Sequence, residues 1–247
     1  MPDVLGRRAK IGVLVPSTNT IVEPDLAALR PPGVTNHTAR ITVPNMRIAS
    51  DEDFLALMKL VDRELYAAAD RVLTAAPDLL LVGMSSVLVW DGYDASERRR
   101  SALEAHAGVP VTGGSFALDA ALRLHGVKRL ALFSPYQPIA DAQVTRFLTD
   151  RGFEVVRFFG FKCQTPLAIA EVGEDTVRQK ILEIDGDDVE AIVQVGTNLS
   201  CMRLCAEAER WLGKPVIAIN PLSYWHALRT LGLEDRIEGY GSLLASH

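Results

Sequence analysis

The sequence predicts an α/β fold built from two similar lobes, and two observations lead to this prediction. Short, nearly continuous apolar runs alternate along the chain with longer segments whose apolar residues recur at helical spacing. Such runs are typical of strands buried on both faces of a parallel sheet, and this alternation is typical of sheets covered by helices. In addition, three stretches of the first half recur in the same order in the second half. We therefore expect an internal duplication.

The expected strands are the apolar runs. They cover residues 10–16, 78–84, 129–135, 191–196 and 215–220. The longest helical pattern covers residues 51–76; it begins with acidic residues directly after Ser50, which is a residue type that caps helix N-termini. These elements predict mostly parallel sheets of four to five strands each, flanked by helices.

The repeat defines the lobes. "KIGVLVPSTN" (10–19) matches "RLALFSPYQP" (129–138), "LLLVGMSS" (79–86) matches "AIVQVGTN" (191–198), and residues 108–127 match residues 213–233. Any two units of strand, turn and helix look alike to some degree, but three pairs in one order favour a duplication. We expect lobes at 1–118 and 119–247, with the last helix able to pack back on the first lobe and an active site in the cleft between the lobes.

Composition excludes several classes of protein. The formal net charge of −5 provides no basic stripe, so we expect no nucleic-acid partner. No apolar run approaches the roughly 20 residues of a membrane helix, and the start does not have the pattern of a signal peptide. The three cysteines have neither metal-site spacing nor an even number for disulfides, which favours a cytoplasmic setting. Nucleotide and metalloprotease motifs are missing, and we expect no nucleotide and no metal.

Four loops follow the expected strands, at Pro16–Thr20, Gly83–Ser86, Ser134–Gln137 and Gly196–Ser200. Ligands of parallel sheets collect at the carboxyl ends of the strands. The loops carry hydroxyl, amide and glycine residues and no charged residue, and such groups bind anions through neutral donors. The predicted ligand is a small carboxylate.

The chain resembles the aspartate/glutamate racemase superfamily, in particular its branch of maleate cis–trans isomerases and arylmalonate decarboxylases. The resemblance rests on "VPSTNTIVEPD" near the start, "HTARITVP" (37–44), "SPY" (134–136), "VGTNL" (195–199) and the closing "KPVIAINPLSYWHALRTLGL". It implies two lobes that close over a small carboxylic acid, no cofactor, and the formation of dimers. It also implies cysteine chemistry, with two cysteines in racemases and isomerases and one in the decarboxylases.

The cysteines depart from that pattern. The family register places Gly83 and Gly196 where cysteines are expected, and a glycine at the first position is what the decarboxylases have. Cys201 begins a helical segment, where a thiol can become reactive, but it can equally pack with Cys205 on one helix face as a small apolar residue. Cys163 is expected in the core.

Other candidates complete the predicted site. The residues expected to bind substrate are Ser17, Asn19, Gly83, Ser85, Ser86, Gly196, Thr197 and Asn198. The candidates for catalysis are Tyr136, Cys201 and His226. Each has a structural alternative: the serines, threonine and asparagines can cap helices or turns, and Tyr136 and His226 can simply be packed. Glu23 and Asp25 are expected to favour a helix N-terminus rather than to act as bases.

The predicted function is that of an isomerase or a decarboxylase-like lyase, which acts on a small carboxylic acid through an enolate-like intermediate. Two-base racemisation is disfavoured, because neither cysteine of the family register is present. Two alternatives stay open. One is a hydrolase or hydratase that uses water in the space of the missing thiols, and the other is a protein that binds a small acid without converting it.

Overall fold

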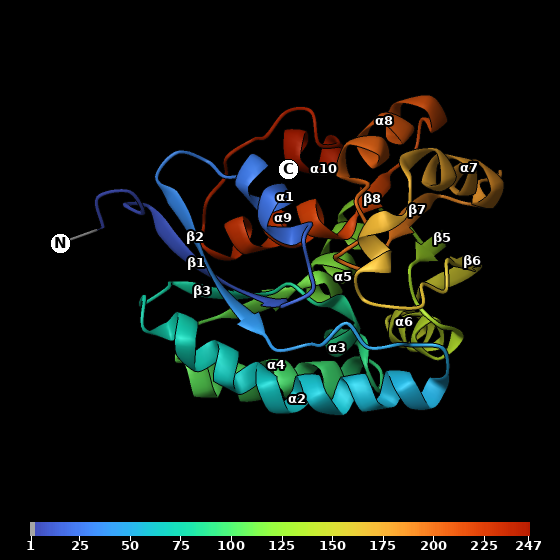
Figure 1. The fold of residues 1–247 in the computed structure, drawn as a ribbon. Coiled ribbons are helices and arrows are strands. Elements are labelled where there is room, and N and C mark those ends of the chain that lie inside the picture. The colour runs from blue at the N-terminus through green and yellow to red at the C-terminus, as the bar shows by residue number, and fades with distance from the viewer. Residues whose placement is uncertain (1–2) are drawn as a thin grey trace.

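The computed structural model describes residues 3–247, which form two parallel sheets flanked by helices (Figure 1). The first half of the chain contains β1 (Ala9–Pro16), α1 (Val22–Ala28), β2 (Val34–Ile41), α2 (Asp51–Leu73), β3 (Leu79–Val82), α3 (Ser85–Val89), α4 (Tyr93–Ala107), β4 (Val111–Gly113) and α5 (Gly114–Leu124). The second half contains β5 (Arg129–Ser134), α6 (Pro138–Asp150), β6 (Glu154–Gly160), the 3₁₀ turn η1 (Ala168–Glu171), α7 (Glu174–Ile184), β7 (Ala191–Gln194), α8 (Met202–Leu212), β8 (Val216–Ala218), α9 (Ile219–Thr230) and α10 (Ser242–Ser246).

Both sheets have four strands and the same topology. Their orders are β2-β1-β3-β4 and β6-β5-β7-β8, and every pairing is parallel. The predicted fold class is therefore confirmed, and the matching strand orders agree with an internal duplication. The predicted boundary between residues 118 and 119 falls inside α5, and α9 packs against α5, α1 and β4 of the first sheet.

Three apolar clusters hold the layers together. One joins the sheets through α5 and α9 and includes Leu118, Leu222 and the buried ring of Tyr224. A second lies between α2 and the other face of the first sheet, and a third lies beneath α7 and α8. In Figure 1, α2 and α4 run below the first sheet while α1 and α9 lie above it. The first cluster makes the two sheets one packed body.

Helix α2 begins where the sequence predicts and ends slightly earlier. Ser50 caps it: the Ser50 side chain accepts a hydrogen bond from the backbone N–H of Asp53, and the Asp53 side chain accepts one from the backbone N–H of Ser50. The next turns carry Phe54 and Leu57, whose buried side chains face the first sheet. The cap thus fixes the start of a helix that forms one wall of the pocket described below.

No helix of the described residues is long and apolar enough to cross a membrane.

Candidate active site

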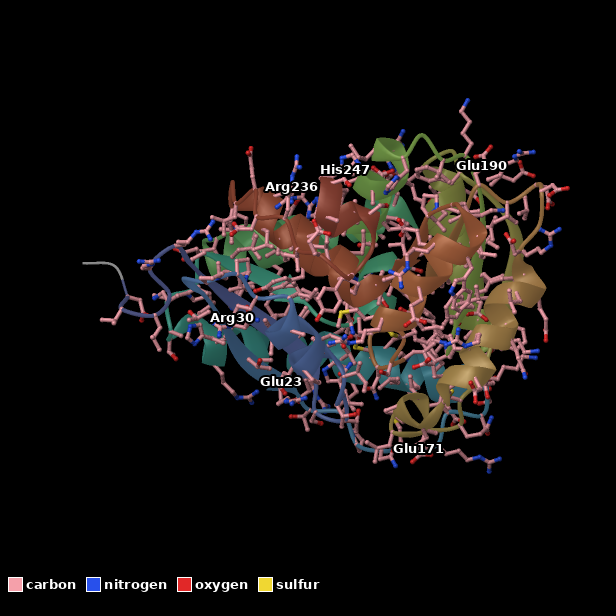
Figure 2. All side chains as sticks on the ribbon, turned by 90° about the horizontal axis from the view of Figure 1, so that it is seen from above. Glu23, Arg30, Glu171, Glu190, Arg236 and His247 are labelled. Carbon is pink, nitrogen blue, oxygen red and sulfur yellow. The ribbon has the colours of Figure 1, made fainter. Side chains whose placement is uncertain are left out.

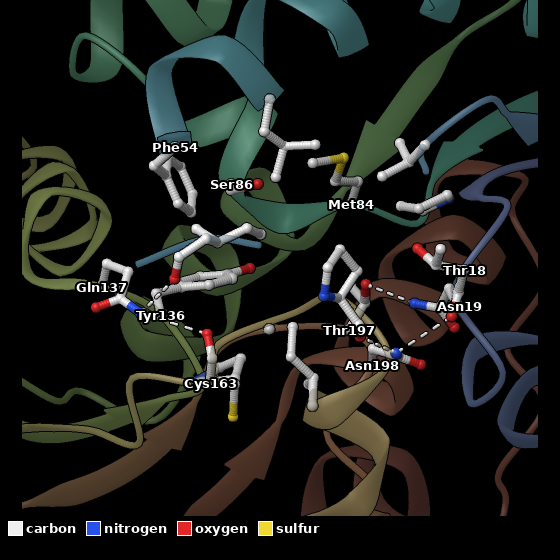
Figure 3. Close-up of a pocket in the computed structure, with 18 residues that line it drawn as sticks. Thr18, Asn19, Phe54, Met84, Ser86, Tyr136, Gln137, Cys163, Thr197 and Asn198 are labelled. Atoms are coloured by element: carbon white, nitrogen blue, oxygen red, sulfur yellow. Dashed lines mark hydrogen bonds between the residues drawn. The ribbon is translucent and has the colours of Figure 1, made fainter. Parts of the chain in front are cut away.

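A pocket lies at the carboxyl ends of the strands, between the two sheets (Figure 3). The space in and above it that protein atoms leave open, solvent at its mouth included, is about 610 Å³. Its polar lining includes Thr18, Asn19, Ser86, Tyr136, Gln137, Thr197 and Asn198. The predicted strand-end loops from both lobes therefore meet at one place.

The loop after β1 and the loop after β7 are joined across the pocket. The amide Nδ2 of Asn19 donates to the hydroxyl of Thr197 over 3.1 Å, and that hydroxyl donates to the carbonyl of Gly83 over 2.9 Å. The backbone N–H of Thr20 donates to Asn198 Oδ1 over 2.9 Å. These contacts connect residues nearly 180 positions apart in the chain, and they hold the two lobes together at the pocket.

The side chains of Asn19 and Asn198 also form hydrogen bonds with backbone groups of the pocket loops. Asn19 Oδ1 accepts the backbone N–H groups of Ile21 and Val22, so Asn19 also caps the start of α1. Asn198 Nδ2 donates to the carbonyls of Pro166, over 2.9 Å, and Thr18, over 3.5 Å. Because the amide hydrogens of Asn198 already have partners, its contribution is to brace the pocket wall. Among residues 3–247, Asn19 Nδ2 donates to Thr197 alone, which leaves its second amide hydrogen for a ligand in the pocket.

Tyr136 is the polar group at the centre of the pocket. Its hydroxyl lies 2.8 Å from the hydroxyl of Ser85, and Ser85 in turn accepts the backbone N–H of Gly196 over 3.2 Å. The Tyr136 ring packs edge-on against Phe54, with centroids 6.0 Å apart. Burial raises the pKa of Tyr136 to about 12, although hydrogen bonds with Ser85 and Ser86 act in the opposite direction. The phenol therefore stays protonated at neutral pH and is a hydrogen-bond donor.

Large apolar side chains also line the pocket, and no charged side chain of residues 3–247 does so. The apolar wall consists of Val43, Ile48, Phe54, Leu57, Met84 and Ile169. Charged side chains such as Glu171, Glu190 and Arg236 project from the periphery instead (Figure 2). A ligand in this pocket meets neutral polar groups and hydrocarbon, and no charged side chain.

Several predicted residues stand behind the lining rather than in it. Ser17 accepts the N–H of Val43 and donates to its carbonyl, both over 2.9 Å, so its hydroxyl is fully used in joining two segments of the first lobe. Gly83 and Ser85 contact the lining residues Thr197 and Tyr136 through the hydrogen bonds given above. Ser86 and Gly196 are in the lining itself.

The structure does not bring Cys201 into the pocket. The Cys201 thiol is buried in the cluster beneath α7 and α8, with Cys205 beside it. A hydrogen bond with Cys205 and burial both raise the pKa of the Cys201 thiol, so the helix start produces no reactive thiolate here. This corrects the catalytic role considered for Cys201 and favours its packing alternative.

His226 is also remote from the pocket. Its Nδ1 lies 2.6 Å from the hydroxyl of Thr112, and the side chain faces a separate surface hollow between α4, α5 and α9 that also contains Arg100. Burial and the Arg100 charge lower the pKa of His226, which keeps the imidazole neutral. This corrects the proton-transfer role considered for His226, because its position on α9 directs the side chain to this separate hollow and not into the pocket.

Cys163 lines the pocket although we expected it in the core. It follows β6 in an irregular segment, and burial raises the pKa of its thiol to about 11. Figure 3 shows its sulfur directed away from Tyr136, whereas the Cys163 carbonyl accepts from Gln137 Nε2 over 3.3 Å. Gln137 lies in one of the four predicted loops but was not among the named site residues, and the apolar wall was not predicted. Their signal was weak, because an apolar residue in an amphipathic helix looks the same whether it faces a sheet or a cavity.

The two glycines at the expected cysteine positions do not leave empty space. A Cβ on Gly196 would lie 2.3 Å from Pro135 Cδ, and the Gly196 φ of +107° is one that side chains rarely allow. A Cβ on Gly83 would lie 2.6 Å from Val15 Cγ1. Along the Cβ direction of these glycines, Val15 and Pro135 occupy the space that a side chain would need, although Gly196 itself lines the pocket.

No group of three or more histidine, cysteine, aspartate or glutamate side chains within the described part of the chain could hold a metal ion.

Comparison with known proteins gives the family. The model of the arylmalonate decarboxylase family matches residues 11–244, and the chain belongs to this family. The maleate isomerase of Nocardia farcinica is 28% identical over 249 residues, which are 95% of this chain and 95% of that protein. The maleate isomerase of Pseudomonas putida is 25% identical over 247 residues, which are 96% and 97% of the two chains.

The solved structures agree in fold. The Nocardia farcinica maleate cis-trans isomerase bound to TRIS superimposes with a TM-score of 0.87 at 23% identity, and the match covers 96% of this chain and 98% of that one. The predicted relationship to the branch of maleate isomerases and arylmalonate decarboxylases is confirmed, and the prediction of an isomerase or lyase agrees with the names of these relatives. The alignment of the family's cysteines with Gly83 and Gly196 stays a prediction.

Proposed function

We propose that this protein is an enzyme that decarboxylates a small malonate-type acid carrying an apolar substituent, without a cofactor, through an enediolate held by neutral donors. The observation that carries the proposal is the composition of the pocket lining: hydroxyl and amide groups, large apolar side chains, and no charged side chain among the lining residues. Membership in the arylmalonate decarboxylase family supports the reaction class.

Loss of carbon dioxide suits such a pocket electrostatically. The carbon–carbon bond to one carboxylate breaks, its electron pair moves into the remaining carboxyl group as an enediolate, and the carbon then takes up one proton that comes from solvent water. A carboxylate placed against hydrocarbon is poorly solvated and becomes neutral carbon dioxide. The apolar wall, with Ile48, Phe54 and Leu57, offers that environment and space for an alkyl or aryl group.

The enediolate is stabilised by Tyr136 in this proposal. Because Ser85 accepts the N–H of Gly196, its own hydrogen is free to be donated to the Tyr136 oxygen. That arrangement leaves the phenolic hydrogen to point into the pocket, where the spare amide hydrogen of Asn19 adds a second donor. Preorganised neutral donors in a closed site strengthen as negative charge develops on the substrate.

Isomerisation of a cis-diacid is less well supported by this pocket, although relatives named maleate isomerase cover nearly the whole chain. A diacid that keeps both carboxylates needs donors at both ends, and the resemblance implies two cysteines for isomerisation but one for decarboxylation, so the two glycines count more against isomerisation. The one thiol that lines the pocket, among the described residues, belongs to Cys163, and its raised pKa keeps it protonated.

The proposal is tested by proton NMR of the wild-type protein in D₂O with phenylmalonate, alkylmalonates, maleate, aspartate and hydantoins. We expect phenylmalonate or an alkylmalonate to lose carbon dioxide and to gain one deuterium at the α-carbon. Conversion of maleate to fumarate alone would replace the decarboxylase by an isomerase. Ring opening would instead support the hydrolase alternative, and tight binding without turnover would support a protein that only binds acids.

A further inference from the structure

A polar contact behind the pocket joins three elements and has no part in the proposed reaction. The Nδ2 of Asn220, in the first turn of α9, donates to Asp25 Oδ2 of α1 over 2.8 Å and to the carbonyl of Thr197 over 3.0 Å. Neither Asp25 nor Asn220 lines the pocket. A single buried amide thus ties two helices to the loop that follows β7.

The Asp25 carboxylate depends on this amide. Burial raises the pKa of Asp25, and the hydrogen bond from Asn220 is the interaction that favours its charged form. None of the ion pairs formed by residues 3–247 includes Asp25. A charged, partly buried carboxylate without a cation destabilises the folded protein unless it accepts a hydrogen bond. The folded protein therefore favours the orientation of Asn220 in which its Nδ2 donates to Asp25.

That orientation determines where Thr197 lies. With its carbonyl held by Asn220, Thr197 places its hydroxyl to accept from Asn19 and to donate to the carbonyl of Gly83. We propose that Asp25 and Asn220 are positioning residues: Asp25 orients Asn220, and Asn220 fixes Thr197 so that its hydroxyl meets Asn19 inside the pocket. The effect on turnover rests on the proposed function, whereas the effect on Thr197 does not.

The other acidic residue of α1 serves the opposite loop. Glu23 pairs with Arg40 of β2, and Arg40 Nη1 donates to the carbonyl of Asn19 over 2.7 Å. The two carboxylates of this short helix therefore each support one pocket loop through an intermediate side chain. Glu23 and Asp25 both lie in the first turn of α1, as expected from the sequence. In addition to that position, each binds a side chain that in turn contacts a pocket loop.

The test compares Asn220→Ala, Asp25→Ala, Asp25→Asn and the double variant Asp25→Ala/Asn220→Ala, with Asp62→Asn on the exposed side of α2 as a charge-matched control. The first readout is the ¹³C-methyl NMR signal of Thr197 in the ligand-free protein, assigned by its loss in Thr197→Ser. The second is kcat/KM for phenylmalonate. Asn220→Ala and Asp25→Ala are expected to shift the Thr197 methyl signal and to lower kcat/KM about tenfold, because a small displacement of binding groups is costly for turnover.

Two further results are required. Asp25→Asn keeps an acceptor for Asn220 and should leave both readouts close to wild type, and the double variant should be no worse than Asn220→Ala alone, because the two residues act as one unit. An unmoved Thr197 signal in Asn220→Ala, additive losses in the double variant, or no rescue by Asp25→Asn would overturn the inference. If the wild type does not turn over phenylmalonate, the proposed function fails, and the Thr197 signal still decides this inference.

Discussion

Replacing Tyr136 by phenylalanine removes the hydroxyl that faces Ser85 and keeps the ring that packs against Phe54. We expect Tyr136→Phe to lower kcat/KM about 100-fold with little change in stability, because removal of one oxyanion donor has an effect of that order. Steady-state kinetics with phenylmalonate check this, with Tyr66→Phe on the surface as control. Since the pKa of Tyr136 is raised to about 12, its donor should persist to pH 9 and above. Full activity of Tyr136→Phe would remove Tyr136 from the mechanism.

A second residue-scale prediction concerns Asp141, which accepts the hydroxyl of Ser134, while Ser134 accepts the backbone N–H of Tyr136 over 3.0 Å. Burial raises the pKa of Asp141 from 3.8 to about 6, against the effect of Lys162. A raised pKa means that the protonated form is favoured in the folded state, so the stability that Asp141 contributes is present below pH 4 and is lost as pH rises through 6. An asparagine side chain at this position would not titrate.

The free energy of unfolding of Asp141→Asn, relative to that of the wild type, should therefore be greater at pH 7.5 than at pH 4.5. Urea unfolding at both values measures the difference. The same difference at the two pH values would show that Asp141 does not titrate with a raised pKa.

The residue types of the loops predicted that neutral polar groups line the pocket, but they did not predict the role of each individual residue. Asn19, Ser86, Tyr136 and Thr197 reach the pocket because strand ends of parallel sheets meet at one edge. Cys201 and His226 do not, because the direction of a helical side chain depends on where the helix docks, and the sequence does not contain that information locally. The position of Cys163 depends on the path of an irregular segment, which no periodicity describes.

At the scale of elements, the turn after β7 depends on Gly196. We expect Gly196→Ala to destabilise the protein by about 3 kcal/mol, because its φ is positive and the added Cβ would overlap Pro135. Gly173→Ala, with a φ of −69° and open space around it, should change stability by less than about 0.5 kcal/mol and is the matched control. Equal unfolding midpoints for the two variants in urea would contradict this account of the turn.

The sequence located the central strands and α2 well and the peripheral strands poorly. Central strands such as β3 and β7 are fully buried and give continuous apolar runs. The edge strand β6 has half-buried residues along most of its length, and β4 has three residues, so neither forms a recognisable run. The run 215–220 is strand only to Ala218, because α9 begins at Ile219 and its first turn supplies Asn220 to the network behind the pocket.

At the scale of the whole molecule, the pocket is formed where loops at the strand ends of two equivalent sheets meet. The same strand order in both halves brings the loop after β1 opposite the loop after β7, and the Asn19–Thr197 contact closes the space between them. The duplication therefore explains why residues from both ends of the chain build one site. The dimer and the cytoplasmic location implied by the resemblance and the composition stay predictions, and light scattering of the purified protein checks the first of them.

The central claim is that a neutral, partly apolar pocket makes this protein a decarboxylase of substituted malonates rather than an isomerase of small diacids. The most direct measurement is the ratio of kcat/KM for phenylmalonate to that for maleate, with both reactions followed by NMR in D₂O. The account predicts a ratio well above about 100, because the apolar wall accepts a phenyl group and offers no donor to a second retained carboxylate. A ratio below 1, with fumarate as the product from maleate, would contradict it.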